Sequence, residues 1–185
     1  MKINPPSVIF VRHGETKLNA NNIVRGWSNA PIDKEGLEEA EEAAKEFADA
    51  KIDCIYYSPL KRAEQTAKLI QKHHDTEVDA IPEDALKTWN IGEFQGEKKT
   101  EEIKEVLREF EKQSSVKVPG GESYDNFKER VKEFTDKMFK EAKQDNVNLL
   151  LVTHNKVFKY ILDDPETEPG ECEIFHWNGK KWKQQ

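Results

Sequence analysis

Cysteine and long hydrophobic runs are scarce in this chain of 185 residues, and each shortage excludes a class of protein. The two cysteines, Cys54 and Cys172, lie far apart inside apolar segments, so we expect buried free thiols rather than a disulfide or a metal pair. No apolar run is long enough for a membrane span or for the core of a signal peptide. These features predict a cytoplasmic protein that has no membrane partner.

Positive charge is also in deficit. The 29 Lys and Arg residues are outnumbered by 36 Asp and Glu residues, which gives a formal net charge of -7. A surface of that sign repels nucleic acid, so we expect no nucleic-acid partner, while protein partners stay open. An anionic substrate would require a local basic pocket. The length of the chain predicts one domain, 1–185, around a single core.

Short apolar blocks alternate between strand and helix patterns along the chain. Buried-type apolar runs predict strands at Val8–Val11, Cys54–Ser58, Glu77–Ile81, Asn148–Thr153 and Cys172–Trp177. Apolar residues at helical spacing predict helices from the Asp33 cap to about Ala50, from Leu60 to Ile70, from Glu101 to Gln113, from the Ser123 cap to Met138, and from about Lys156 to Leu162. The alternation predicts an α/β protein with a parallel sheet.

The segments between these elements are predicted to be loops. We expect an irregular loop at Lys17–Asn29, a structured loop at Glu83–Gly96 and an acidic loop at Asp163–Gly170. Asn178-Gly179 is a strong signal for a type I′ hairpin turn, which would return the chain along the strand Cys172–Trp177. The sheet is therefore expected to end on an antiparallel C-terminal edge.

Three strand-to-helix junctions carry side chains that suit phosphate chemistry. Arg12 and His13 directly follow the first strand. Arg62 lies in the first helical turn after the second strand, and His154 directly follows the apolar run LLLV. Because the carboxyl ends of parallel strands share one edge of the sheet, we expect these side chains to converge.

An imidazole beside two guanidinium groups is suited to phosphoryl transfer. The arginines can orient a phosphate group and spread its charge, while a cationic environment favours the neutral, nucleophilic form of the imidazole. We therefore predict that His13 is transiently phosphorylated, and that Arg12, Arg62 and His154 act with it.

Four motifs carry a resemblance to the histidine phosphatase superfamily, the phosphoglycerate mutase-like proteins. RHGET at 12–16 is similar to the signature of the family, and SPLKRAEQTA at 58–67 resembles the block that supplies its second arginine. PGGES at 119–123 and VTH at 152–154 resemble two further elements. The resemblance implies a three-layer α/β/α sandwich with a mainly parallel sheet, a phosphohistidine intermediate, and no metal or other cofactor.

The resemblance also implies roles for single side chains. His13 matches the nucleophile, and Asn19 matches an asparagine on the phosphate side of the site. We group Thr16 and Gly14 of the RHGET motif with Asn19 as substrate-binding residues.

Two positions depart from the pattern of the family. Thr88 stands where the family often has a glutamate that acts as general acid, and threonine cannot donate a proton as a carboxylic acid does. Glu93 and Glu122 are candidates to replace that acid, and Glu122 could instead hold an arginine of the pocket in place. Asn155 stands where glycine is usual, a milder change because asparagine tolerates a left-handed backbone.

Three functions remain open at this point. The first is a phosphatase that hydrolyses small phosphomonoesters, and the second is a mutase that returns the phosphoryl group to a sugar acid. The chain has no long insertions that could close over an intermediate and exclude water, which favours hydrolysis. The third is a pseudo-phosphatase that only binds phosphorylated ligands. Thr88 in place of the expected glutamate supports this hypothesis, whereas the presence of the nucleophile His13 argues against it.

Overall fold

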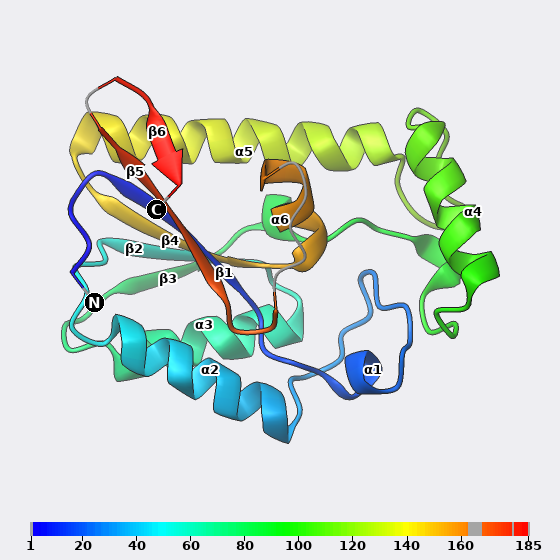
Figure 1. Ribbon diagram of the computed structural model, residues 1–185, viewed down its shortest axis with the longest axis horizontal. Coiled ribbons are helices and arrows are strands. Elements are labelled where there is room, and N and C mark those ends of the chain that lie inside the picture. Colours follow the sequence, from blue (N-terminus) through cyan, green and yellow to red (C-terminus); the bar gives the residue numbers. More distant parts are fainter. Residues whose placement is uncertain (1, 163–167, 179, 185) are drawn as a thin grey trace.

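The computed structural model describes residues 2–162, 168–178 and 180–184, which form a six-stranded sheet in the order β3-β2-β4-β1-β5-β6 (Figure 1). The parallel strands are β1 (Ser7–Arg12), β2 (Cys54–Tyr57), β3 (Asp79–Pro82) and β4 (Asn148–Thr153). The antiparallel edge consists of β5 (Cys172–Trp177) and β6 (Trp182–Gln184). The predicted mainly parallel sheet with an antiparallel C-terminal edge is confirmed.

Helices cover both faces of this sheet because its central strands are apolar on both sides. One face packs against α2 (Lys34–Phe47) and α3 (Lys61–His73), and the other against α5 (Tyr124–Asp145) and α6 (Asn155–Leu162) (Figure 1). Alternate residues of β1 point to opposite faces, so Ile9 packs in the first core and Phe10 in the second. The result is the predicted three-layer sandwich.

A third apolar cluster lies beyond the sheet and supports the helix α4 (Glu101–Lys112). Trp89, Phe127 and Val157 form part of its buried centre, while Leu107 and Phe110 of α4 pack against it. No residue of α4 is itself buried. Figure 1 shows this helix at one side of the molecule, away from the sheet.

The loops contain more regular structure than the sequence predicts. The short helix α1 (Lys17–Ala20) lies within the predicted irregular loop, because the side chain of Thr16 caps it by accepting a hydrogen bond from the Asn19 N–H. The predicted structured loop contains the 3-10 turns η1 (Asp84–Leu86) and η2 (Gly92–Phe94). The hairpin residue 179 and residues 163–167 of the predicted acidic loop lie outside the described residues. No described helix is long and apolar enough to cross a membrane.

Candidate active site

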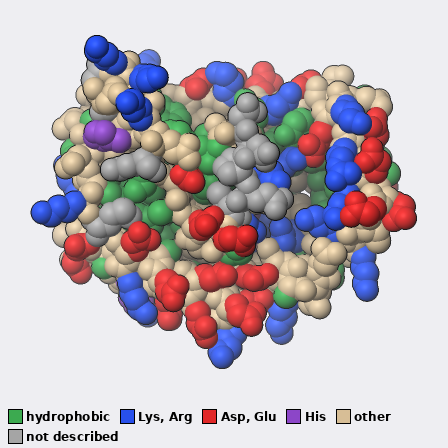
Figure 2. Space-filling view, in the orientation of Figure 1, with side chains coloured by type: hydrophobic (Ala, Val, Ile, Leu, Met, Phe, Trp, Pro, Cys, Tyr) green, Lys and Arg blue, Asp and Glu red, His purple; other side chains and the backbone are tan. Residues whose placement is uncertain are grey.

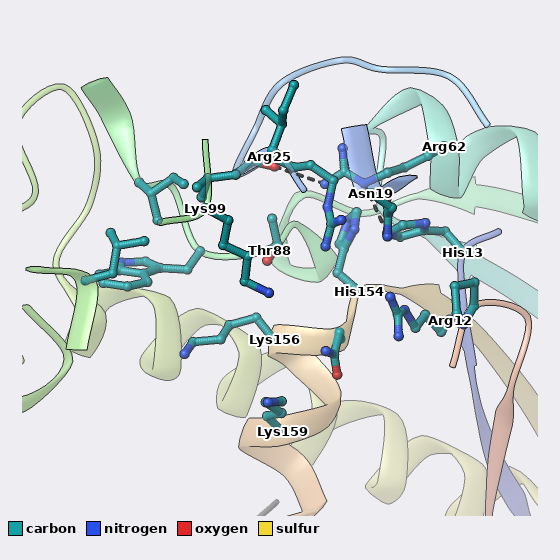
Figure 3. Close-up of a pocket in the computed structure, with 18 of the residues that line it drawn as sticks. Arg12, His13, Asn19, Arg25, Arg62, Thr88, Lys99, His154, Lys156 and Lys159 are labelled. Carbon is teal, nitrogen blue, oxygen red and sulfur yellow. Dashed lines mark hydrogen bonds between the residues drawn. The ribbon is translucent and has the colours of Figure 1, made fainter. Parts of the chain in front are cut away.

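The three junctions meet at the carboxyl edge of the parallel strands (Figure 3). This follows from the strand order, since β1 and β2 both flank β4. The rings of His13 and His154 have their centroids 5.0 Å apart, and Arg62 Nε lies 3.1 Å from His13 Nε2. Side chains from three segments that are remote in sequence, the first of which carries both Arg12 and His13, therefore line one cavity.

The hydrogen bonds of His13 determine which of its nitrogens can react. Nδ1 lies 2.7 Å from the carbonyl oxygen of Gly14, which can only accept, so the ring proton sits on Nδ1. Nε2 then carries the lone pair and accepts a hydrogen bond from Arg62 Nε. Burial, and next the charge of Arg62, hold the pKa of His13 well below its usual range. The imidazole is thus neutral and has its lone pair on Nε2, which is the form a nucleophile needs.

Arg62 is held rigidly before any ligand arrives. Its two terminal nitrogens donate to the carbonyl oxygens of Ser28 (2.8 Å) and Gly26 (2.9 Å). Burial, and next the neighbouring Arg25, lower the pKa of Arg62 to about 9, so the guanidinium remains charged at neutral pH. A charge that is fixed in advance costs little reorganisation when an anion binds.

His154 and Arg12 each present a buried nitrogen that has no hydrogen-bond partner among the described residues, namely His154 Nδ1 and Arg12 Nε. His154 Nε2 lies 2.7 Å from Ser58 Oγ, and burial followed by the charge of Arg62 keeps the pKa of His154 well below its usual range. If the Ser58 hydroxyl donates to Nε2, the proton of His154 resides on Nδ1. His154 Nδ1 and Arg12 Nε are then both N–H donors, and a bound anion could accept a hydrogen bond from each of them.

Arg25 belongs to the same site, although nothing in the sequence analysis singled it out. It lines the cavity, and burial, followed by the charge of Arg12, lowers its pKa to about 10. The only signal in the sequence is a cation beside Gly26 in the segment that follows Asn19. Gly26 has a φ of +49°, a conformation that glycine adopts readily, and its carbonyl oxygen accepts from Arg62.

Of the three predicted substrate-binding residues, only Asn19 lines the cavity. Thr16 is fully buried and donates its hydroxyl to Asn19 Oδ1 (2.6 Å), which leaves the Asn19 amide group as the part able to donate to a ligand. Gly14 packs against α2, where a Cβ would lie 2.2 Å from the Gly36 carbonyl oxygen. Thr16 and Gly14 therefore support Asn19 and His13 rather than forming the wall.

The carboxylates that we considered as replacement acids lie outside the cavity wall. Thr88 does line the cavity, but Glu93 is exposed elsewhere and Glu122 forms an ion pair with Arg130. Among the described residues, the carboxylates that do line it are Glu15, Glu111 and Glu168. Neither Glu93 nor Glu122 therefore has the position that a replacement acid needs.

Glu122 and Arg130 brace the segment that carries Thr88. Arg130 donates to the carbonyl oxygens of Ala85 (2.9 Å), Lys87 (2.7 Å) and Thr88 (2.9 Å), and its Nη2 lies 2.6 Å from Glu122 Oε1. The same carboxylate oxygen accepts the backbone N–H of residue 90 at 2.8 Å. Glu122 therefore does hold an arginine in place, but the expectation of an arginine of the pocket is wrong, because Arg130 does not line the cavity.

Asn155 does not adopt the left-handed backbone conformation that asparagine tolerates. It is the first residue of α6, and the described non-glycine residues with positive φ are Asn22 and Asn146. An asparagine in place of glycine therefore introduces no left-handed strain here.

The cavity in front of His13 has a volume of about 730 Å³ and a strongly basic wall. Its described cationic residues are Arg12, Arg25, Arg62, Lys99, Lys104, Arg108, Lys156 and Lys159. Figure 2 shows Lys and Arg side chains gathered around the hollow on this face, whereas Asp and Glu side chains crowd the surface over α2. An acidic protein thus provides the local basic pocket that an anionic substrate requires.

Comparison with known proteins places this geometry in a family. The sequence profile of the histidine phosphatase superfamily, branch 1, matches residues 8–176. The chain is 31% identical over 189 residues to the metal-independent phosphoserine phosphatase of Arabidopsis thaliana, with 95% of this chain and 78% of that protein covered. It is 29% identical over 161 residues to the 2,3-bisphosphoglycerate-dependent phosphoglycerate mutase of Cytophaga hutchinsonii, with 85% and 76% covered.

A solved structure shows the same fold. Phosphoglycerate mutase from Bacillus anthracis superposes with a TM-score of 0.81 at 22% identity, covering 98% of this chain and 92% of that one. The chain therefore belongs to the histidine phosphatase superfamily, as its motifs indicated.

The brace predicts a measurable loss of stability. Glu122→Gln removes the charge that faces the largely buried Arg130, so we expect the free energy of unfolding to fall by about 1–3 kcal/mol and kcat/KM to fall with it. Glu129→Gln, at an exposed position of α5 next to Arg130 in the sequence, should change the free energy of unfolding by less than about 0.5 kcal/mol. Equal losses of unfolding free energy for the two substitutions, measured by denaturant unfolding, would contradict a stabilising role of the Glu122–Arg130 ion pair.

The buried histidines predict how stability depends on pH. The folded-state pKa values of His13 and His154 lie below the ordinary value of 6.5, so the unfolded chain binds more protons below that pH. The stability that these rings contribute is therefore present above pH 6.5 and declines as the pH falls below it. Unfolding free energies measured between about pH 7.5 and about pH 5.5 should fall less steeply in His13→Gln than in wild type. His73→Gln, at the exposed end of α3, should keep the wild-type slope. An unchanged slope in His13→Gln would show that this ring is not held neutral.

Proposed function

We propose that the protein is a phosphatase that hydrolyses small phosphomonoesters through a phosphohistidine intermediate on His13. The observation that carries this proposal is the state of the His13 ring. Its Nδ1–H donates to the Gly14 carbonyl, so the lone pair lies on Nε2, which accepts a hydrogen bond from Arg62 Nε. A module that only binds phosphate has no need of a neutral imidazole oriented in this way.

In the first step, His13 Nε2 attacks the phosphorus atom, the bond from phosphorus to the ester oxygen breaks, and the leaving oxygen takes a proton from water to become the alcohol. Arg12, Arg25 and Arg62 supply the positive charge that balances the phosphoryl oxygens. If the Ser58 hydroxyl donates to His154 Nε2, then His154 Nδ1–H, which has no partner among the described residues, can donate to one of those oxygens. These cations also provide the charge stabilisation for which other phosphatases use a metal ion, so the proposal includes no metal.

In the second step, water attacks the phosphorus atom of the phosphohistidine, the phosphorus–nitrogen bond breaks, and inorganic phosphate leaves. Hydrolysis requires that water reaches the intermediate. In the described part of the chain, the α4 side of the cavity wall is formed by α4 and by Lys99 of the short connection 95–100, which carries no long insertion. This supports hydrolysis over transfer to a second alcohol, which benefits from exclusion of water.

A mutase is the second candidate, and the resemblance to phosphoglycerate mutases favours it. Such an enzyme uses the same phosphohistidine but returns the phosphoryl group to a hydroxyl of the bound acid. Incubation with a phosphorylated sugar acid distinguishes the two reactions, because a phosphatase releases inorganic phosphate whereas a mutase releases an isomer.

The nucleophile and the phosphate pocket should separate in mutants. His13→Ala should abolish release of p-nitrophenol from p-nitrophenyl phosphate, yet retain part of the affinity for vanadate because the arginines remain. Arg62→Ala should weaken both, since each charge-assisted contact contributes about 1.5–3 kcal/mol. Wild-type activity should be unaffected by EDTA. Activity of His13→Ala at the wild-type level would exclude the assigned nucleophile, and activity that disappears in EDTA and returns with a divalent ion would exclude the metal-free mechanism.

The position of Thr88 predicts a dependence on the leaving group. Without a carboxylic acid beside the ester oxygen, aryl phosphates should be cleaved far faster than alkyl phosphates, because general acid catalysis contributes about 10²–10⁴-fold. Thr88→Glu should then raise kcat for alkyl phosphates selectively, since Thr88 lines the cavity.

Three substitutions identify an acid elsewhere in the chain. Glu15→Gln tests a carboxylate of the cavity wall, while Glu93→Gln and Glu122→Gln test the two carboxylates that we first considered. The replacement acid is the residue whose change slows alkyl phosphates much more than aryl phosphates. Equal rates for both ester classes in wild type, with chemistry rate-limiting and no selective effect in any variant, would end the idea of a missing acid.

A further inference from the structure

The hydroxyl group of Ser58 is buried where two neighbouring strands end. The strands β2 and β4 are parallel neighbours, and the Ser58 N–H donates to the Val152 carbonyl oxygen at 3.0 Å. The residues that follow the two strands therefore lie side by side, which brings Ser58 Oγ within 2.7 Å of His154 Nε2. Ser58 has no exposed surface and His154 is 3% exposed, so this contact is shielded from bulk water.

The partners of Ser58 determine the direction of this hydrogen bond. Among the described residues, Ser58 Oγ has two partners, His154 Nε2 and the backbone N–H of Leu60 at 3.4 Å. Because the Leu60 N–H can only donate, His154 Nε2 is the one acceptor that these contacts offer to the hydroxyl proton. The reverse arrangement, in which Nε2–H donates to the serine, would leave a buried hydroxyl proton without an acceptor, which is unfavourable.

The same accounting places the ring proton of His154. When Nε2 accepts from Ser58, its lone pair is used there, and a neutral ring carries its proton on Nδ1. Nδ1 is the buried ring nitrogen that has no partner among the described residues, and His154 lines the cavity in front of His13. The N–H group of His154 is therefore the part of the ring that is left for a ligand.

His13 and His154 thus share a tautomer but use it in opposite ways. His13 directs Nδ1–H to the Gly14 carbonyl and keeps the lone pair of Nε2 for the reaction. His154 directs the lone pair of Nε2 to Ser58 and keeps Nδ1–H. With the ring centroids 5.0 Å apart, one ring can attack a phosphoryl group while the other donates a hydrogen bond to it.

The position of this proton matters because His154 is uncharged. Burial, and next the charge of Arg62, keep the pKa of His154 well below its usual range. A neutral imidazole has a single N–H group, so the other tautomer would turn a lone pair toward the phosphoryl oxygens and repel them. The group that binds Nε2 therefore decides whether His154 assists the reaction or opposes it.

We propose that Ser58 is a positioning residue that holds His154 in the Nδ1–H tautomer, so that the uncharged ring donates a hydrogen bond to the phosphoryl group. The effect on turnover rests on the proposed phosphatase function, whereas the tautomer itself does not. A donor whose orientation and proton are fixed in advance requires no reorganisation when the phosphoryl group binds.

Nitrogen-15 NMR of the histidine rings tests the tautomer directly, because protonated and unprotonated ring nitrogens have well-separated signals. The signals of His154 are those that disappear in His154→Ala. Above neutral pH, Nδ1 of His154 should carry the proton in wild type and Nε2 should not. In Ser58→Ala the proton should move partly or wholly to Nε2. A protonated Nε2 in wild type, or unchanged signals in Ser58→Ala, overturns the proposal.

Ser7→Ala is the matched control. Ser7 is also a buried serine beside a histidine, since its Oγ lies 3.3 Å from His176 Nδ1, but it is the first residue of β1 and so lies at the opposite end of the sheet. Its removal should leave the His154 signals unchanged, and a shift as large as that in Ser58→Ala would overturn a specific role of Ser58. If Ser58→Ala does not fold, Ser58→Cys takes its place with the same two outcomes, because a thiol donates only weakly.

A double-mutant cycle separates positioning from packing. In Ser58→Ala, kcat/KM for p-nitrophenyl phosphate should fall about 2–10-fold, which is the effect of about one hydrogen bond. The same substitution should cause no further fall in a His154→Ala background, because Ser58 acts through that ring. Ser7→Ala should keep the wild-type kcat/KM. An equal fall in both backgrounds would overturn the assignment of Ser58 as a positioning residue.

Failure of the proposed function and failure of this inference are distinguishable. Absence of turnover in wild type would end the phosphatase proposal, and the NMR signals would still decide the tautomer. The affinity for vanadate then replaces kcat/KM in the cycle. A loss of affinity in Ser58→Ala that is absent in the His154→Ala background supports the role of Ser58, and an equal loss in both overturns it.

Discussion

The hydrogen bond from Arg62 Nε to His13 Nε2 is the contact on which the site depends. It requires a neutral imidazole, and the Gly14 carbonyl, by accepting from Nδ1–H, supplies the matching tautomer. It also requires a guanidinium that stays in place without a carboxylate partner among the described residues, which the carbonyl oxygens of Gly26 and Ser28 achieve. Backbone oxygens hold both side chains and do not neutralise the positive charge that a phosphate group needs. The short helix that Thr16 caps, the turn at Gly26 and the close packing of Gly14 on α2 all maintain this arrangement.

Much of this fold could be predicted from the sequence because its signals are local. The run LLLV is apolar at every position, which indicates a strand covered on both faces, and β4 is fully buried. Asp33 and Ser123 cap α2 and α5 as expected. Parallel order then brings the strand ends together, so the convergence of the junctions at His13 and His154 also followed from the pattern.

The remaining features depend on contacts between segments that no local pattern connects. Arg25 lies in a stretch without periodicity, and only folding turns it toward Arg12. Glu93 and Glu122 both lie in glycine-rich stretches, but the backbone directs one to the surface and the other to Arg130. The basic wall combines residues of α4 and α6 with the strand-end arginines, so its charge is a property of the tertiary structure. A net charge of -7 gives no indication of it.

The central claim is that the phosphoryl group passes through His13 Nε2. Rapid acid-free quenching of wild-type protein during turnover of a ³²P-labelled ester, followed by peptide mapping under alkaline conditions, tests it most directly. We expect the label on the peptide that contains RHGET, with ³¹P NMR of matched unlabelled material identifying phosphorus on Nε2 of the ring. Label on another residue, or single-turnover kinetics in which phosphate forms without any labelled protein, would contradict the account.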